Sequence, residues 1–177
     1  MDKNELIYLI NKYKPIQNYW ELYWLLDQVE RLNPNVILEI GVNTGGTLGL
    51  WNYVLRNKRN PILIGVDIEN KLKWDTRKSK NKIKFLIADS IKQDTVVKVK
   101  NILQDKKVDF LYIDGNHSEK YVTSDYQNYS KFVRRGGIVA FHDINNVRHP
   151  GVGQFWSKVI GRKEICICNH GTGIITV

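Results

Sequence analysis

The sequence predicts an α/β fold of the doubly wound type, in which helices cover both faces of a mostly parallel sheet. Short apolar runs bounded by turn signals, which are typical of buried strands, alternate with helical patterns along most of the chain. The last two runs are separated only by Asn169 to Thr172, and this spacing indicates a hairpin. We therefore expect one antiparallel strand near the end of the sheet.

The elements are expected in regular alternation after two initial helices. The strands are expected at residues 36–40, Ile62 to Asp67, Ile83 to Asp89, Val108 to Asp114, Gly137 to Asp143, Glu164 to Cys168 and Gly173 to Val177. The helices are expected at Lys3–Tyr13, Tyr19–Leu32, Thr47 to Arg56, Ile91 to Leu103, Glu119 to Val133 and Gly153 to Ile160. We expect a single domain over residues 1–177, with the initial helices in residues 1–34 and the core in residues 35–177.

The second helix has more aromatic residues than one buried face requires. Leu22, Leu25, Leu26 and Val29 form one apolar stripe, and Tyr19, Trp20, Tyr23 and Trp24 widen it. One interpretation is a helix that is buried on two sides. The other is a lid over a site or a subunit contact, since aromatic anchors are enriched at such surfaces. A homo-oligomer through this helix is therefore one of the expectations.

Bulk properties exclude some function classes. The net charge is +9, with Lys and Arg concentrated between Arg56 and Lys84. A basic stripe can attract nucleic acid, but few aromatic residues accompany this one, so we favour a solvated surface over a nucleic-acid partner. No apolar run reaches membrane-spanning length, and Asp2 and Glu5 argue against a secretory leader. Only Cys166 and Cys168 are present, poorly placed to bridge each other, which predicts a reduced, cytoplasmic setting.

A glycine-rich turn follows the first predicted strand. Gly41, Gly45 and Gly46 allow close approach to a ligand at the position where open α/β sheets bind nucleotides. A dinucleotide fingerprint would have glycine where Asn43 stands, and the carboxylate of Glu39 is a poor neighbour for a pyrophosphate. The carboxylate of Glu39 instead suits a ligand that carries an amino group. This pattern favours S-adenosylmethionine over NAD.

Acidic residues recur at the ends of the predicted strands. Asp67, Asp89, Asp114 and Asp143 end four strands and, with Glu39, are expected to line the ligand-binding edge of the sheet. One such residue is commonly a turn or cap residue, but five at corresponding places predict a polar site. Asp67 lies about 26 residues beyond Gly41, somewhat farther than the usual distance of about 20 to a ribose-binding acid, and an acid here can accept from both ribose hydroxyls.

Several motifs together resemble the class I S-adenosylmethionine-dependent methyltransferases. The closer likeness is to the small O-methyltransferases that include cephalosporin-hydroxylase-like and macrolide-sugar enzymes. The motifs are Leu38 to Gly46, Gly65-Val66-Asp67, Ala88-Asp89-Ser90, Ile113 to Ser118 with Tyr121-Val122 and Asp125, Arg135 to Ile144, Gly151 to Trp156 and Gly171-Thr172-Gly173. The resemblance covers nearly the whole chain from about Tyr19 onward.

The resemblance implies a Rossmann-like sheet of seven strands in the order 3-2-1-4-5-7-6, with strand 7 antiparallel. It implies an S-adenosylmethionine-dependent enzyme that methylates a hydroxyl of a small molecule, sugar or glycan. The expected cofactor-binding residues are Glu39, Gly41, Asn43, Gly45, Asp67, Asp89, Ser90 and Asp114. The alternative is a basic nucleic-acid- or glycan-binding module that keeps this fold without the activity.

The catalytic residues are expected at the ends of the fourth and fifth strands. His117 is the candidate base, because imidazole titrates near neutrality and this residue follows Asp114 closely. A loop histidine that caps the next helix is the alternative interpretation. Asp114 and Asp143 complete the predicted catalytic set.

Asp114, His142 and Asp143 are the candidate ligands of a divalent metal. Mg²⁺ prefers oxygen ligands, whereas imidazole suits Zn²⁺, Mn²⁺ or Fe²⁺ better. The metal-dependent relatives have an oxygen ligand where His142 stands, so His142 departs from their pattern. We expect Mg²⁺ or Mn²⁺ if a metal binds. The alternative is that His142 and Asp143 orient the substrate or each other without a metal.

Overall fold

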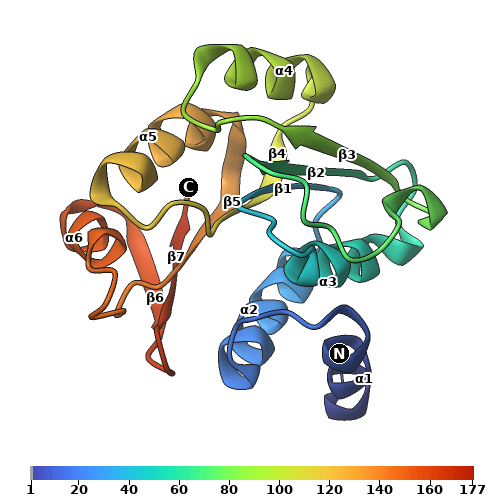
Figure 1. Ribbon diagram of the computed structural model, residues 1–177, viewed down its shortest axis with the longest axis horizontal. Coiled ribbons are helices and arrows are strands. Elements are labelled where there is room, and N and C mark those ends of the chain that lie inside the picture. Colours follow the sequence, from blue (N-terminus) through green and yellow to red (C-terminus); the bar gives the residue numbers. More distant parts are fainter. Residues whose placement is uncertain (1) are drawn as a thin grey trace.

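The centre of the protein is a seven-stranded sheet, described by a computed structural model that covers residues 2–177. The strand order is β3-β2-β1-β4-β5-β7-β6. Pairing is parallel from β3 to β5, whereas β7 runs antiparallel to both β5 and β6 (Figure 1). The fold class and the strand order predicted from the sequence are therefore confirmed.

Most elements lie within a few residues of their predicted positions. The strands are β1 Val36–Ile40, β2 Ile62–Asp67, β3 Lys82–Ile87, β4 Val108–Ile113, β5 Val133–His142, β6 Arg162–Cys166 and β7 Thr172–Thr176. The helices are α1 Lys3–Tyr13, α2 Tyr19–Leu32, α3 Gly46–Val54, α4 Gln93–Leu103, α5 Glu119–Tyr129 and α6 Gly151–Lys158. Short 3-10 turns lie at Leu55–Asn57, Thr76–Lys78 and Ser130–Phe132.

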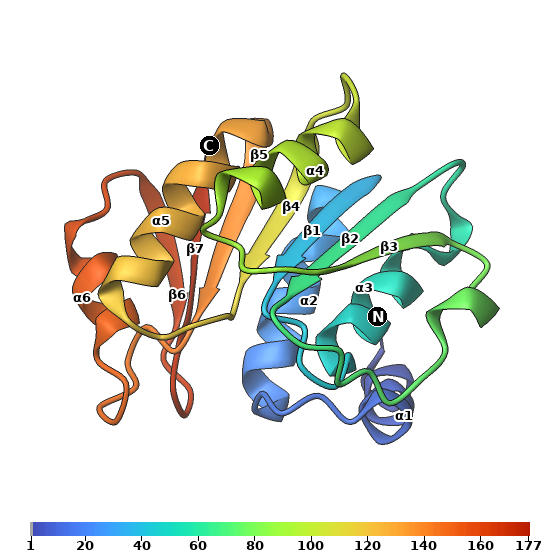
Figure 2. The same ribbon diagram turned by 45° about the horizontal axis from the view of Figure 1, so that its top comes forward.

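The helices form two layers, one on each face of the sheet (Figures 1 and 2). Helices α1, α2 and α3 pack on one face, and α4, α5 and α6 pack on the other. Successive side chains of a strand point to opposite faces of the sheet. Ile37 of β1 therefore packs in the core under α1, α2 and α3, while Leu38 and Ile40 pack in the core under α4, α5 and α6. Burial on both faces explains why β1 is apolar at nearly every position.

The largest departure from the predicted boundaries lies at the start of β5. A helix was expected through Val133 and a strand from Gly137, but α5 ends at Tyr129 and β5 already begins at Val133. Arg134 lies in the strand, where its Nε donates to Oδ1 of Asp109 at 2.5 Å. This ion pair holds the early part of β5 beside β4. A long-range contact therefore overrides the helical pattern.

Helix α2 is buried on one face only. Leu22, Leu25, Leu26 and Val29 are buried, as the apolar stripe predicted. Trp20 and Tyr23 are 58% and 45% exposed, so two-sided burial does not account for these rings. They pack on each other edge to face. A lid or a subunit contact at this surface stays a prediction.

The state of the two cysteines and the character of the helices both bear on the expected setting of the chain. Cys166 ends β6 and Cys168 lies in the β6–β7 connection, and both thiols are free. Within residues 2–177, no helix combines the length and the apolar character that crossing a membrane requires.

Candidate functional site

A cavity of about 570 Å³ opens at the carboxyl ends of the parallel strands. This volume falls within the range of roughly 300–1,000 Å³ that is typical of small-molecule sites. The wall includes residues from the ends of β1, β2, β4 and β5, from the loop after β3, and from the α1–α2 connection. The predicted site residues on the wall are Gly41, Asn43, Asp67, Asp89, Ser90, Asp114, His117, His142 and Asp143.

The turn after β1 is shaped by a close approach to the end of β4. Gly41 has φ +84°, and a Cβ built there would lie 2.1 Å from the carbonyl oxygen of Asp114. Gly46, which begins α3, is equally crowded, because its Cβ would lie 2.4 Å from Cα of Pro15. Glycine is therefore required at position 41 for the close approach of the end of β4, and at position 46 for the contact with the α1–α2 connection.

Asp67 holds this turn in place through backbone hydrogen bonds. Its Oδ2 accepts from the amides of Val42 and Asn43 at 2.8 and 2.7 Å, and its Oδ1 accepts from the amide of Glu69 at 3.0 Å. Each carboxylate oxygen can accept about two hydrogen bonds, so Oδ2 is fully used and Oδ1 keeps one free position. The predicted ribose contact has only this oxygen available.

Two of the predicted cofactor residues do not line the cavity. Glu39 is fully buried behind the wall, where Oε1 accepts from the hydroxyl of Thr47 and Oε2 has no partner among residues 2–177. Burial raises the pKa of Glu39 well above its usual value, although the hydrogen bond from Thr47 opposes the shift. Gly45 lies beneath Trp74, whose indole N–H donates to the Gly45 carbonyl at 2.8 Å.

The loop after β3 contributes the polar groups at one end of the cavity. Oδ1 of Asp89 accepts from the amide of Ile91 at 3.2 Å, and Asp89 and Ser90 both line the wall. Behind them, Asp125 of α5 is buried and neither carboxyl oxygen has a partner among the described residues. Burial raises the pKa of Asp125 to about 7.

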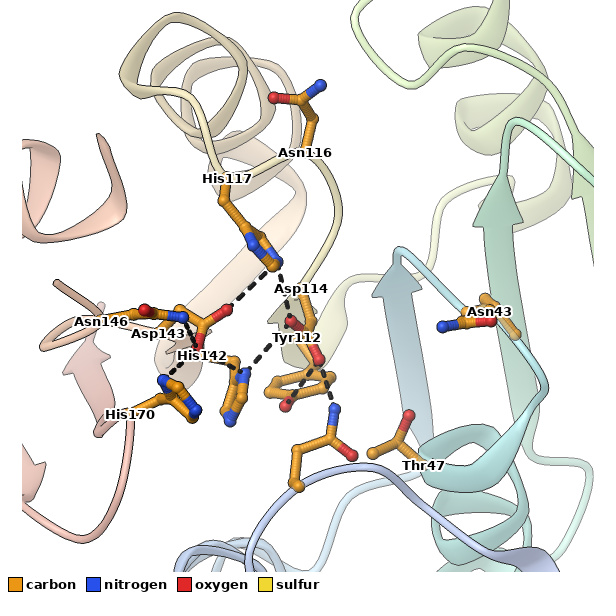
Figure 3. A network of polar contacts seen from close by, with 12 residues as sticks. Asn43, Thr47, Tyr112, Asp114, Asn116, His117, His142, Asp143, Asn146 and His170 are labelled. Atoms are coloured by element: carbon orange, nitrogen blue, oxygen red, sulfur yellow. Dashed lines mark hydrogen bonds and ion pairs between the residues drawn. The ribbon is translucent and has the colours of Figure 1, made fainter. Parts of the chain in front are cut away.

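Two aspartates and two histidines converge at the other end of the cavity (Figure 3). Nε2 of His117 lies 3.2 Å from Oδ2 of Asp143 and 3.6 Å from Oδ1 of Asp114. Nδ1 of His142 lies 3.4 Å from Oδ1 of each aspartate. In this network carboxylates alternate with imidazole rings, and we call the four side chains the aspartate–histidine cluster.

The pKa values in this cluster follow from its pairing. Burial alone would raise the pKa of Asp114, but the charge of His142 and the hydrogen bonds from His117 and His142 outweigh burial and hold it well below its usual range. The hydrogen bond to Asp114 raises the pKa of His117, although burial opposes the shift. The aspartates therefore remain ionised and the histidines gain basicity.

The cluster contains a group that could hold a metal ion, but it differs from the predicted one. Among residues 2–177, Asp114, His117 and Asp143 can each offer one ligand atom, and these atoms lie within 4.8 Å of one another. His142, the predicted third ligand, faces carboxylates with both ring nitrogens, since its Nε2 lies 3.3 Å from Oε2 of Glu21. His117 belongs to this group of three where the predicted set had His142, and a ligand role of His142 stays a prediction.

Sequence reasoning missed two residues that connect the initial helices to the site. Glu21 of α2 is buried; its Oε1 accepts from the amide of Gly171, and its Oε2 contacts His142. Its local signal was the capping box that begins α2 with Asn18, but no local pattern indicates contacts with two distant segments. Gln17 donates from Nε2 to Oδ2 of Asp114, across 97 positions of sequence.

Comparisons with known proteins agree with this geometry. Residues 38–144 match the family model described as a methyltransferase domain, which is more than half of the chain. The uncharacterized protein R132 of Acanthamoeba polyphaga mimivirus is 31% identical over 122 residues, which are 63% of this chain and 52% of that protein. The chain therefore spans about half the length of this relative.

Solved structures with the same fold include three methyltransferases. CalS11, a TDP-rhamnose 3′-O-methyltransferase of calicheamicin biosynthesis, has a TM-score of 0.70 at 14% identity, over 99% of this chain and 87% of that one. MycE, of mycinamycin biosynthesis, has a TM-score of 0.69 at 15% identity over 97% and 54%, in a complex with Mg, SAH and mycinamycin VI. A putative caffeoyl-CoA O-methyltransferase of Staphylococcus aureus has a TM-score of 0.73 at 16% identity over 97% and 90%.

Proposed function

The chain belongs to the family of methyltransferase domains, as its sequence motifs predicted, and from this premise we propose that it methylates a hydroxyl of a small molecule or sugar. The cofactor of this reaction would be S-adenosylmethionine. The observation that carries the proposal is the position of the aspartate–histidine cluster at one end of a cavity whose other end has polar groups suited to a nucleoside. Two of the three similar proteins, CalS11 and the Staphylococcus aureus protein, are described as O-methyltransferases, which supports a hydroxyl acceptor.

The wall of the cavity fits this cofactor. The glycine-rich turn allows backbone approach, the free position of Oδ1 in Asp67 can accept from a ribose hydroxyl, and Asp89 and Ser90 offer groups to the adenine. When bound, the cofactor supplies a methyl group on a sulfonium sulfur, and the neutral thioether that remains is a good leaving group. What the protein must add is the position and the nucleophilicity of the acceptor oxygen.

His117 is the residue that we propose to remove the acceptor proton. A carboxylate only accepts hydrogen bonds, so the ring atom that faces Asp143 at 3.2 Å must carry the proton, and Nδ1 is left with the lone pair. Asp114 and Asp143 would then orient the ring and stabilise the imidazolium that forms. This division of roles follows from the two carboxylates that His117 contacts through one nitrogen.

A divalent metal would use the same nitrogen of His117. Asp114, His117 and Asp143 provide two oxygen donors and one nitrogen donor, a set that suits Mn²⁺ and also fits Mg²⁺ with added water. A metal bound there would lower the pKa of a coordinated hydroxyl. The complex of MycE with Mg supports testing for this ion. Because Nε2 cannot both bind a metal and donate to Asp143, the two roles of His117 exclude each other.

The acceptor has a separate approach to the cluster. A second, more open hollow shares Asn116 and His117 with the cavity, and Arg148 and His149 also line it. We propose that the acceptor enters here, opposite the cofactor, which an in-line displacement requires. Specificity would then depend on the loop after β5, where Val147 is 90% exposed.

A pair of substitutions tests the proposed chemistry. With His117→Ala we expect turnover to fall by about 10²–10⁴-fold, the range for loss of a general base, while the affinity for S-adenosylhomocysteine stays within about twofold. Lys120→Ala is the control, because Lys120 is exposed on the nearby helix α5 and lines neither the cavity nor the second hollow. Turnover would be followed as S-adenosylhomocysteine released with a panel of sugars and phenols, with and without a chelator.

Equal activity of the two variants would overturn the role of His117. Loss of activity on chelation, with full recovery on adding Mn²⁺ or Mg²⁺, would favour the metal-ligand role over the base. The binding-module alternative stays a prediction: it requires that the wild-type protein not bind S-adenosylhomocysteine, and that its binding to nucleic acid weaken steeply as salt is added.

A further inference from the structure

The connection between α1 and α2 forms one wall of the cavity. Pro15, Ile16 and Gln17 all line it, although the rest of the initial helical segment packs on the core. The contact of Pro15 with Gly46 holds this connection against the start of α3. Gln17 is thereby placed between the glycine-rich turn and the aspartate–histidine cluster.

The orientation of the Gln17 amide is determined by its partner. Nε2 donates to Oδ2 of Asp114 at 2.5 Å, and the reverse orientation would set two acceptors against each other. Oε1 must therefore point away from Asp114. This oxygen is buried and has no hydrogen-bond partner among residues 2–177. Buried side-chain acceptors nearly always have a donor, so a missing partner in a ligand cavity indicates a donor on the ligand.

The donor with the best chemical match is an ammonium group. Oδ2 of Asp114 already accepts from Nε2 of Gln17 and from the hydroxyl of Tyr112 at 3.3 Å. The negative charge of Asp114 therefore lies next to the amide of Gln17 and its unpaired Oε1. Glu39, the residue that the sequence offered for an amino group, lies behind the wall and does not line the cavity. The cavity therefore needs another acceptor for a cationic amino group.

We propose that Oε1 of Gln17 accepts a hydrogen bond from the α-amino group of S-adenosylmethionine, and that Gln17 thereby sets the position of the amino-acid end of the cofactor beside Asp114. This inference rests on the proposed function, since it takes the cofactor as given. Gln17 belongs to the helical segment outside the region matched by the family model, which begins at residue 38. The initial helices are then part of the cofactor site rather than only a cover.

Two ligands distinguish this role from others. S-adenosylhomocysteine has the amino group, whereas 5′-methylthioadenosine keeps the adenine, ribose and thioether but lacks the amino acid. In calorimetric titrations, Gln17→Leu should lower the affinity for S-adenosylhomocysteine by about tenfold to a hundredfold, the effect of losing a hydrogen bond to a charged group. Binding of 5′-methylthioadenosine should change by less than about twofold. Gln28→Leu, the same substitution on α2 away from the cavity wall, should change neither.

Each other outcome contradicts a specific part of the proposal. Equal weakening of both ligands by Gln17→Leu would mean a structural role, and no weakening would mean that Oε1 has no ligand partner; either overturns the inference while the proposed function stands. A change confined to the KM of the acceptor would assign Oε1 to the acceptor hydroxyl instead. If the wild-type protein binds neither ligand, the proposed function itself fails.

Discussion

The two ends of the cavity use the same residue type in opposite ways. At the end formed by β4 and β5, Asp114 contacts two histidines and Asp143 contacts three, and both carboxyl pKa values lie below the usual range, because this pairing outweighs burial. At the end formed by the loop after β3, Asp125 has no partner among the described residues and its pKa is raised. Burial is common to both ends, so the difference comes from the partners.

This comparison shows what an acidic residue near a strand end can mean. Asp67 fixes the glycine-rich turn through amides, Asp114 belongs to the aspartate–histidine cluster, and Glu39 lies inside the core, where burial raises its pKa. The sequence places all three at corresponding positions, but only their neighbours assign a role. Removing a paired acid and removing an unpaired acid should therefore change stability in opposite directions.

The largest effect is expected at Glu21, which connects α2 to the aspartate–histidine cluster. Glu21→Leu removes the partner of His142 and leaves the amide of Gly171 unpaired, so the free energy of unfolding should fall by about 3–5 kcal/mol. Urea unfolding in the presence of a chelator measures this. Asp27→Asn is the control on the same helix. Among residues 2–177 the ion pair of Asp27 is with exposed Arg31 at 2.9 Å, so this substitution should cost at most about 1 kcal/mol. Equal effects of the two substitutions would remove Glu21 from the network.

A smaller effect of opposite sign is expected at Asp125. Because its pKa in the folded state is about 7, against 3.8 as the ordinary value, the folded protein holds a proton that the unfolded chain releases. Its contribution is therefore fully present below about pH 4 and is lost as the pH rises through 7. Asparagine does not titrate, so Asp125→Asn should remove this loss. The free energy of unfolding of the variant, relative to that of the wild type, should therefore rise by roughly 2–4 kcal/mol between pH 4 and pH 7.5.

The slope of stability with pH is the measurement for Asp125, since a constant packing cost of the amide cancels from it. Urea unfolding at several pH values gives this slope. A difference between variant and wild type that does not change with pH would show that Asp125 is already ionised in the folded protein, and the contrast between the two ends would then not hold.

Local patterns predicted the fold well because the fold depends on them. Both ends of α1 and α2 match their predicted positions, since Asn18 caps α2 and leucines mark its buried face. Strand β2 also matches, as a buried apolar run between turn signals. Element order and hairpin spacing left few arrangements of the sheet to choose from.

The site was only partly predictable, because its contacts join distant segments. The sequence indicated that Asp114 and His117 lie in one loop, but it could not show that Gln17 and Glu21 reach the same cluster, 97 and 121 positions away from their partners. It also could not show which face of β1 Glu39 joins. A strand that is apolar on both faces gives no signal for the direction of one polar residue.

The central claim is that the cavity binds S-adenosylmethionine with the sulfonium end toward Asp114 and His117. Isothermal titration of the wild-type protein with S-adenosylmethionine tests it most directly. We predict one binding site per chain, with an affinity that falls in Gln17→Leu and is retained in His117→Ala. No binding heat at millimolar cofactor, with the protein shown to be folded, would contradict the claim.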